Sequence, residues 1–414
     1  MASLFSTALG CAASGSDDRA HGPVFDPHDA GSSDATGEGA PPKPVGDAAV
    51  DVPAFDSALP EAAPADAPHD SADSTSACTD KTALVAGNGT TLYGALKTGD
   101  GAWATSSTSS AVLSAPALVA TGGGFHAVIR ASGNALKWTA TAGASWSALA
   151  QIGQATTRDT PSLATLGAAV HLVYQGNDFK YYHGTFSGGA WDAASDPVGG
   201  ASAQSFGPSA PSTAGVGAEL LVAHRGGNAS VELYDEIYAS GGWQPGHLQT
   251  GVQLETIPTT TMAMNGGTSD AMIAFLRLGD FKISYVTRVA SAWSSAKILD
   301  TTAYANDRLG LAPLPGGRAV LVYRGSDGKP YFSVYDATAV PEWTLPAPLV
   351  AGTNPQIAGV PAIAPGACGD EAVAALAIAG GDVLVTRFVG GVWTSPAAIT
   401  GTGSSTSLAI ATSK

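Results

Sequence analysis

The chain has 414 residues and a formal net charge of −15, yet only 13% of its residues are charged, about half the usual share. Residues 12–77 hold thirteen acidic and two basic side chains, so this segment supplies −11 of the net charge. The rest of the chain has no basic footprint. This excludes nucleic acid as a partner and excludes a polybasic membrane-surface patch.

At the amino end, Ala8-Leu9-Gly10 precedes Cys11 and resembles the processing box of bacterial lipoproteins, in which the cysteine is acylated. The apolar run before it is short and has no basic flank, so residues 1–11 would be a truncated or degenerate signal. A fortuitous apolar start with a free cysteine is the alternative. With Cys11 acylated, we expect an exported lipoprotein at the outer membrane or cell surface of a bacterium. No other segment has the length of a transmembrane helix.

The next segment, residues 12–77, is rich in Ala, Pro, Asp, Gly and Ser and has only Phe25 and Phe55 as aromatic residues. Such a stretch cannot bury enough apolar area to offset its chain entropy. Its charges repel one another and its prolines stiffen it. The sequence therefore predicts a disordered, extended linker between the anchor and a folded domain at 78–414.

Seven of the eight tryptophans recur at intervals of 43 to 52 residues, each after a short turn such as "FSGGAW" or "VGGVW". They are Trp103, Trp146, Trp191, Trp243, Trp293, Trp343 and Trp393. A period of this length indicates a repeat architecture. We expect each of these rings to pack between neighbouring repeats, while Trp138 lies off the period and its role is open.

Each period contains four short strand patterns and no helical one, with Asn, Asp or Gly turns suited to hairpins. After Trp393 the chain supplies an outer strand and one inner strand, whereas residues 78–103 supply only a second and a third strand. Together the two ends complete one unit. The sequence thus predicts an all-β, seven-bladed propeller of four antiparallel strands per blade, closed by terminal strands that share one blade.

Cys78 and Cys368 precede equivalent strands of adjacent predicted blades. With Cys11 acylated, they are the two remaining thiols, so a disulfide is an option in an exported protein. The alternative is two unpaired thiols, because matching sites on neighbouring blades can exceed the roughly 7 Å that a disulfide spans between Cα atoms.

The repeat form, an Asn/Asp-Gly turn, an aromatic strand and then Gly-Gly-x-Trp, resembles the tryptophan repeats of seven-bladed bacterial and fungal β-propeller lectins, including fucose-binding ones. The resemblance covers residues 79–414 as a rhythm. "TATAGASW" (Thr139–Trp146) is also similar to the Asp-box of sialidase-type propellers, with Thr141 where that box has Asp. The resemblance implies a sugar-binding propeller, and the Asp-box itself implies a folding element.

Signatures of catalysis and of metal binding are weak. A sialidase-like site would need an arginine triad, a Tyr–Glu nucleophile pair and an Asp that acts as the general acid. The sequence contains arginines but not the motifs of such a site. The densest acidic spot, "ELYDEIY" (Glu232–Tyr238), is interpreted as a solvated outer-strand face. The histidines have no metal-ligand spacing, and no cofactor fingerprint occurs, so we expect no metal and no cofactor.

Two sets of residues are candidates for ligand binding. The first set comprises arginines that end the second strand of four repeats, together with aromatic neighbours that could stack on a pyranose: Arg130, Tyr174, Arg225, Arg277, Tyr323 and Arg324. Arginines that simply cap their hairpins are the alternative. The second set lies in variable loops expected at one face of the channel: Arg158, Asp159, Asp307 and Arg308.

These observations lead to one main hypothesis, a surface-tethered, non-enzymatic propeller that binds a glycan or glycoconjugate. It would be monomeric and would meet the membrane only through its lipid. A propeller-type, sialidase-like glycoside hydrolase is one alternative. A structural or protein-interaction propeller without a small-molecule ligand is another. Two carboxylates in one pocket would favour the hydrolase.

Overall fold

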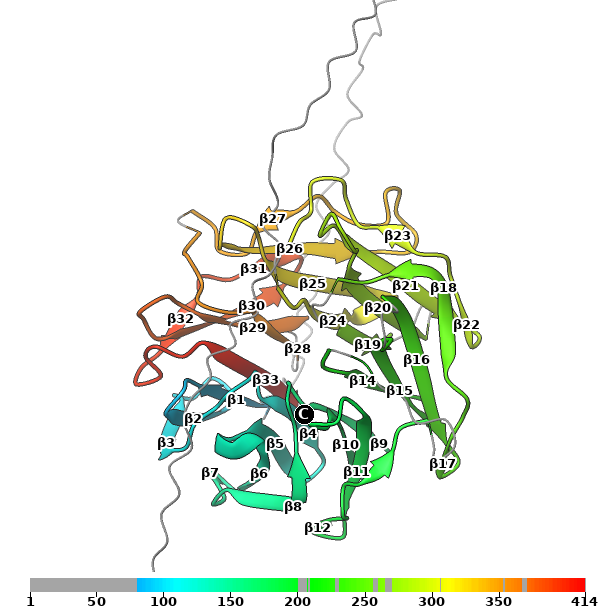
Figure 1. Ribbon diagram of the computed structural model, residues 1–414. Helices are drawn as coiled ribbons and strands as arrows, with labels where there is room; N and C mark the ends of the chain where they lie inside the picture. The colour runs from blue at the N-terminus through cyan, green and yellow to red at the C-terminus, as the bar shows by residue number, and fades with distance from the viewer. Residues whose placement is uncertain are drawn as a thin grey trace, which may run out of the picture. The chain divides into compact units, whose positions relative to one another are not determined.

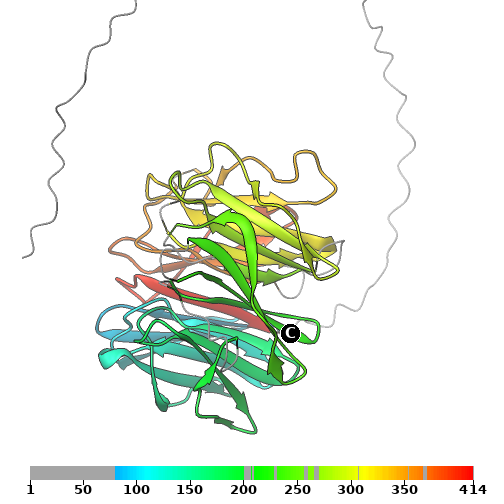
Figure 2. The ribbon, with the colours of Figure 1, turned by 45° about the vertical axis from the view of Figure 1, so that its right-hand side comes forward.

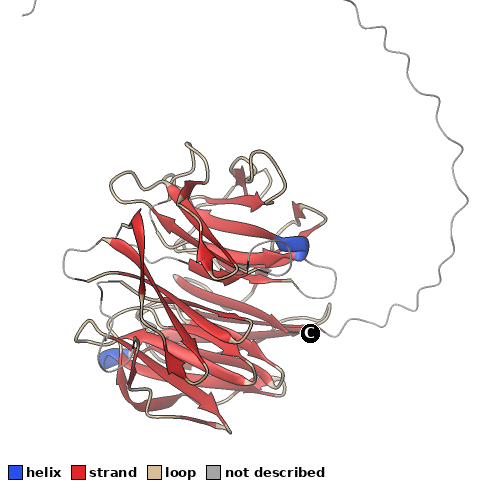
Figure 3. Ribbon diagram, turned by 90° about the vertical axis from the view of Figure 1, so that its right-hand side faces the viewer, coloured by secondary structure: helices blue, strands red, loops and turns tan. Residues whose placement is uncertain are grey.

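The computed structural model describes residues 80–413, apart from 200–206, 208, 228–230, 256–259, 265–269, 306, 353 and 367–370. Almost every described element is a β-strand, with single helical turns at Ser132–Asn134 and Pro315–Gly317 (Figure 3). None of the helical segments in this part of the chain is long and apolar enough to cross a membrane. Cys11, the predicted linker 12–77, Cys78 and Cys368 lie outside the described residues.

The strands form seven separate sheets, or blades, each with four positions from the inner to the outer strand. The inner strands are β4 (Ala117–Thr121), β9 (Ser162–Leu166), β14 (Ser212–Val216), β19 (Thr260–Ala263), β24 (Gly310–Leu314), β28 (Ala362–Pro365) and β33 (Ser407–Ser413). The second strands are β1 (Lys81–Gly87), β5 (Gly124–Arg130), β10 (Ala169–Gln175), β15 (Glu219–Arg225), β20 (Ala271–Leu276), β25 (Arg318–Arg324) and β29 (Ala372–Ala377).

The third and outer positions complete each blade. The third strands are β2 (Thr91–Thr98), β6 (Ala135–Ala142), β11 (Tyr181–Ser187), β16 (Glu232–Ala239), β21 (Ile283–Val289), β26 (Pro330–Tyr335) and β30 (Val383–Val389). The outer strands, most of them in two pieces, are β3 (Ala104–Ser109), β7 (Ser145–Trp146) with β8 (Ala150–Thr156), β12 (Ala190–Trp191) with β13 (Asp196–Pro197), β17 (Gly242–Trp243) with β18 (His247–Gln253), β22 (Ala292–Trp293) with β23 (Lys297–Ile298), β27 (Ala347–Pro348), and β31 (Val392–Trp393) with β32 (Ala397–Ile399).

The two ends of the described chain share blade 1, as the sequence predicts. Strand β33 pairs with β1 in antiparallel register, from Lys81 opposite Ser413 to Gly87 opposite Ser407. Each inner strand contacts the inner strand of the next blade around the whole circle, from β33 through β4 to β28 and back to β33. Figures 1 and 2 both show the red C-terminal strand beside the blue first strands. The closed ring of seven blades is therefore confirmed.

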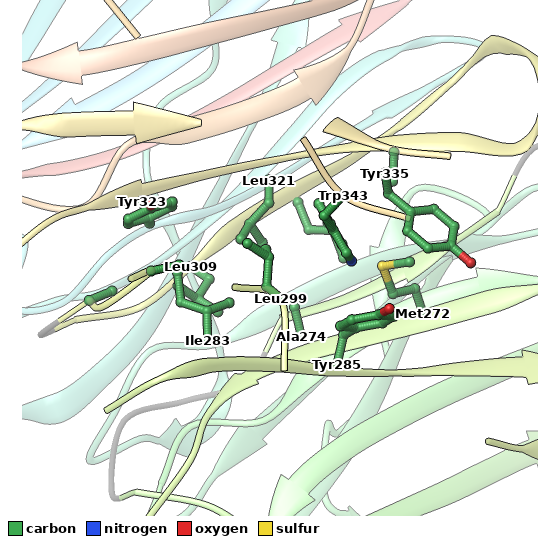
Figure 4. Close-up of a cluster of buried hydrophobic side chains, with 14 of the residues drawn as sticks. Met272, Ala274, Ile283, Tyr285, Leu299, Leu309, Leu321, Tyr323, Tyr335 and Trp343 are labelled. Atoms are coloured by element: carbon green, nitrogen blue, oxygen red, sulfur yellow. The ribbon is translucent and has the colours of Figure 1, made fainter. Parts of the chain in front are cut away.

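The periodic tryptophans join the blades, which confirms their predicted packing role. Each of six indoles meets a side of the preceding blade's third strand, and the residue it meets differs from joint to joint. The pairs are Trp146 with Gly94, Trp191 with Trp138, Trp243 with His183, Trp293 with Asp235, Trp343 with Tyr285, and Trp393 with Phe332. The Trp343 joint packs Tyr285 and Tyr335 against the indole (Figure 4).

The third strands are covered on both sides, so one interpretation from the sequence is wrong. Asp235 and Glu236 of β16 are buried, 1% and 3% exposed, and do not form a solvated outer face. Asp235 accepts hydrogen bonds from the Gln249 amide, 2.5 Å away, and from the Trp293 indole. Burial raises the pKa of Asp235 in spite of these donors. The acidic cluster is part of the joints between blades.

The antiparallel pairing gives the ring two distinct faces. The start of each inner strand pairs with the end of the second strand, as Ser162 does with Val173. We call this side the upper face, and the side where inner strands end the lower face. All ten residues predicted to bind ligand belong to upper-face segments, whereas the chain enters the ring at Lys81 on the lower face, opposite Ser413.

Candidate functional site

The upper mouth of the channel contains a cavity of about 490 Å³. Its wall is built from the first residues of the inner strands of blades 1, 2, 3, 4, 6 and 7 and from the loops that lead into them. Three of the four residues predicted for the channel loops line this cavity: Asp159, Asp307 and Arg308. The ring thus brings together residues that are about 150 positions apart in the sequence.

Arg308 is the centre of this arrangement. It comes from the loop into blade 6, and its Nη2 lies 3.5 Å from the carbonyl oxygen of Pro211 in blade 4. The carboxylates of Asp159 and Asp307 attract the guanidinium, and they oppose the lowering of the Arg308 pKa by burial. Arg308 as a whole residue is partly exposed and lines the cavity, while its guanidinium is desolvated.

The two carboxylates are held by their own loops. Asp159 Oδ1 accepts the backbone N–H of Thr160 at 2.7 Å, and Asp307 Oδ1 accepts that of Arg308 at 2.8 Å. Each carboxylate keeps a second oxygen, and both line the same cavity. A guanidinium and two carboxylates that line one cavity offer donors and acceptors together, which is the combination that vicinal hydroxyl groups need.

Hydroxyl side chains complete the mouth, and sequence reasoning missed them. Ser162 and Thr213 share a 2.8 Å hydrogen bond between blades 3 and 4, and Thr160 and Ser212 also line the cavity. The only available signal was their position, since each lies within two residues of the start of an inner strand. Serine and threonine are so frequent in this chain that their identity alone carried no information.

Arg158 does not join this group, although it is adjacent to Asp159. Its side chain is exposed and its guanidinium carbon lies 3.6 Å from the centroid of the Phe179 ring. It is not among the residues that line the cavity. Its cation–π contact with Phe179 stabilises the loop that also carries Asp159.

The four strand-end arginines lie in four different blades and do not converge on one pocket. Arg130 donates through Nε and Nη2 to Asn134 Oδ1, at 3.0 and 2.7 Å, and Arg277 likewise binds Asp280 in its own turn. These two cap their hairpins. Arg225 and Arg324 each have a buried Nε with no hydrogen-bond partner among the described residues.

The predicted stacking rings, Tyr174 and Tyr323, are buried, with exposed fractions of 4% and 2%. Each lies under a second tyrosine of the same blade, Tyr182 and Tyr331 respectively, with ring centroids 5.6 and 5.9 Å apart. Tyr174 and Tyr323 therefore cannot stack on a sugar from solvent. The outer rings are Tyr182 and Tyr331, whose hydroxyls donate to Asp178 and Asp327.

No group of three or more metal-ligating side chains that could hold an ion occurs within the described part of the chain. No protein-family model matches the sequence, and no curated protein matches it.

Solved structures do match. A variant of the lectin from Aleuria aurantia, in complex with Fucα1-6GlcNAc, has a TM-score of 0.50 and 14% identity over 70% of this chain and 96% of its own. The chain shares its fold with β-propeller lectins. AofleA from Arthrobotrys oligospora, in a triple arginine-to-alanine variant, matches with a TM-score of 0.49 and 15% identity over 72% of this chain and 89% of its own.

A sialidase, NanB from Streptococcus pneumoniae, matches more weakly, with a TM-score of 0.36 and 11% identity over 51% of this chain and 34% of its own. The Aleuria lectin is described as six-bladed, whereas the present ring has seven blades. At these identities the similarity concerns the fold alone.

Proposed function

We propose that the protein is a non-enzymatic, carbohydrate-binding propeller and that its main site is the upper channel mouth. The observation that supports this most directly is Arg308, which lines a cavity of about 490 Å³ together with Asp159 and Asp307 and is attracted by both carboxylates. Such a site offers directed hydrogen-bond donors and acceptors beside apolar strand residues, which suits a polyhydroxylated ligand with one apolar face. The shared fold with lectins that bind fucosides is consistent with it.

The first prediction concerns Arg308. Replacing it in Arg308→Met keeps much of the side-chain volume and removes the charge-assisted donors, each of which contributes about 1.5–3 kcal/mol. We expect glycan affinity to fall by about tenfold to a hundredfold. A glycan array identifies the ligand, and isothermal titration calorimetry on the full chain measures the loss.

Arg158→Met is the matched control, because it makes the same change one residue from Asp159 but outside the cavity. It should leave affinity unchanged. A wild-type chain that binds no glycan on the array would favour the structural, interaction-only alternative. If glycan affinity fell in Arg324→Met and not in Arg308→Met, the binding site would instead be at the end of the second strand, where Arg324 Nε has no partner among the described residues.

One observation favours a second candidate function, a glycoside hydrolase. Asp159 and Asp307 line a common cavity, and paired carboxylates across a cleft are what glycosidic cleavage requires. Hydrolysis of array-positive glycans by the wild-type chain, abolished in both Asp159→Asn and Asp307→Asn, would support it. Binding without turnover would support the lectin function.

We also propose that acylated Cys11 tethers the propeller to the outer membrane or cell surface of a bacterium. The support is the sequence Ala8-Leu9-Gly10-Cys11 and the acidic, proline-rich segment that follows it. In cells grown with an alkyne fatty acid, the wild-type chain should be labelled and found in the membrane fraction. Cys11→Ser should lose both the label and the membrane association, and equal labelling of the two chains would contradict the anchor.

A further inference from the structure

A second cavity, of about 580 Å³, opens on the lower face of the ring. It starts where the inner strands of blades 1, 2 and 3 end and runs outward between blades 2 and 3. Thr121, Thr165 and Ser413 form its inner wall, and His126 and Phe186 form its outer part. None of these residues belongs to the channel-mouth cavity of the upper face.

The outer part of this cavity rests on a cluster of four rings that explains the off-period tryptophan. His126 lies 4.7 Å from Phe186, and Trp138 lies 5.0 Å from Phe186, between ring centroids. Trp138 also stacks on His126 at 6.3 Å and meets Trp191 edge-on at 6.5 Å. Phe186 and His126 line the cavity, and the two indoles fix their positions from behind.

One ring nitrogen of His126, Nδ1, is buried and has no hydrogen-bond partner among the described residues. Burial lowers the pKa of His126, so the ring is neutral at neutral pH. The other ring nitrogen, Nε2, is not one of these buried, unpaired atoms, and His126 lines the cavity, so a ligand hydroxyl can pair with Nε2 in either tautomer because a hydroxyl both donates and accepts.

The remaining lining is uncharged. It consists of hydroxyl side chains, small apolar residues and turn glycines, and none of the lining residues that the structure describes carries a formal charge at neutral pH. A charged ligand would lose hydration there without gaining an ion pair. A neutral ring with hydroxyl groups gains hydrogen bonds from Thr121, Thr165, Ser187 and His126 and contact with the face or edge of Phe186.

We propose that this lower-face cavity is a second binding site, built by His126, Phe186 and hydroxyl side chains between blades 2 and 3, for a neutral, hydroxylated ring such as a saccharide unit. It is independent of the channel mouth in position and in chemistry. The proposal shares the ligand class of the proposed function and none of its residues.

The test uses the full chain labelled with 5-fluorotryptophan, with the resonance of Trp138 assigned by Trp138→Phe. Titration with methyl glycosides of glucose, galactose, mannose, fucose and N-acetylglucosamine should shift that resonance saturably for at least one sugar. His126→Phe keeps a ring and removes the nitrogens. It should raise the sugar concentration that gives half of the maximal shift by about fivefold or more. Ala168→Tyr should abolish it, because Ala168 is exposed in the cavity wall.

Ala218→Tyr is the matched control, since Ala218 is exposed in the equivalent turn of blade 4, between β14 and β15. It should leave the shift unchanged. Arg308→Met should also leave it unchanged, which separates this site from the proposed upper one. No saturable shift of the Trp138 resonance by any of these glycosides, or equal affinity in Ala168→Tyr and Ala218→Tyr, would overturn the proposal.

Discussion

Replacing Trp343 by alanine is expected to lower the free energy of unfolding by about 3–5 kcal/mol, the usual cost of deleting a large buried ring. Trp343 is the most buried of the periodic tryptophans, with 3% of its surface exposed. Its ring lies 5.2 Å from Tyr335 in its own blade and 5.5 Å from Tyr285 in the preceding blade (Figure 4). The substitution opens the joint between blades 5 and 6, and urea unfolding followed by far-ultraviolet circular dichroism measures it.

Leu345→Ala provides the control, because Leu345 is two residues away and 71% exposed. It should change the free energy of unfolding by less than about 0.5 kcal/mol. Trp343→Phe should fall between the two, since it retains a ring at the joint. A loss below about 1 kcal/mol for Trp343→Ala would show that the indoles do not hold the blades together.

Acid should destabilise the protein between about pH 6.5 and pH 4 through a buried histidine pair at the joint between blades 3 and 4. His171 Nδ1 lies 2.9 Å from His183 Nε2, and both side chains are at most 5% exposed. Burial, reinforced by the neighbouring His183, lowers the pKa of His171 to about 4. Burial also lowers the pKa of His183, against the opposing attraction of Asp196.

The direction of this pH effect on stability follows from proton linkage. In this window the unfolded chain binds a proton at position 171 that the folded chain does not bind, so stability is complete above pH 6.5 and decreases as the pH falls. A pKa difference of about 2.5 corresponds to roughly 3 kcal/mol for His171 alone. Urea unfolding at pH 7, 5.5 and 4.5 measures the slope.

A double variant isolates this effect from the titration of carboxylates. Blade 6 has Val320 and Phe332 at the positions of His171 and His183, where they pack among buried apolar residues. The variant His171→Val with His183→Phe therefore copies a joint that the ring already contains. Its stability should vary less with pH than that of the wild type, and parallel profiles would rule out the histidine pair as the cause.

The number of blades and their closure could be predicted because both depend on features that repeat. The indole spacing set the period, and the incomplete units at the two ends set the pairing of β33 with β1. Side-chain burial within a blade could not be predicted in the same way. Tyr174 and Asp235 look like surface residues of alternating strands, but in a propeller the neighbouring blade covers the second face of the sheet.

The channel site shows the same division. The predicted strand order placed the loops before the inner strands at the channel mouth. Asp159, Asp307 and Arg308 were candidates because they lie in these loops. That Arg308 reaches toward Pro211 in another blade, and that Arg158 turns onto Phe179 instead, depends on side-chain directions across the ring. In the sequence, only the off-period Trp138 pointed to the lower cavity. Its partners Phe186 and His126 lie in two different blades and belong to no recognisable motif.

The shared blade also determines how the ring responds to a mechanical pull on its amino-terminal segment. Such a force would enter at Lys81, the first residue of β1, and β1 is hydrogen-bonded along its whole length to β2 on one side and β33 on the other. A force directed along β1 would have to shear both ladders together, whereas an edge strand has only one ladder to lose. The last strand of the chain thereby serves as a clamp on the first.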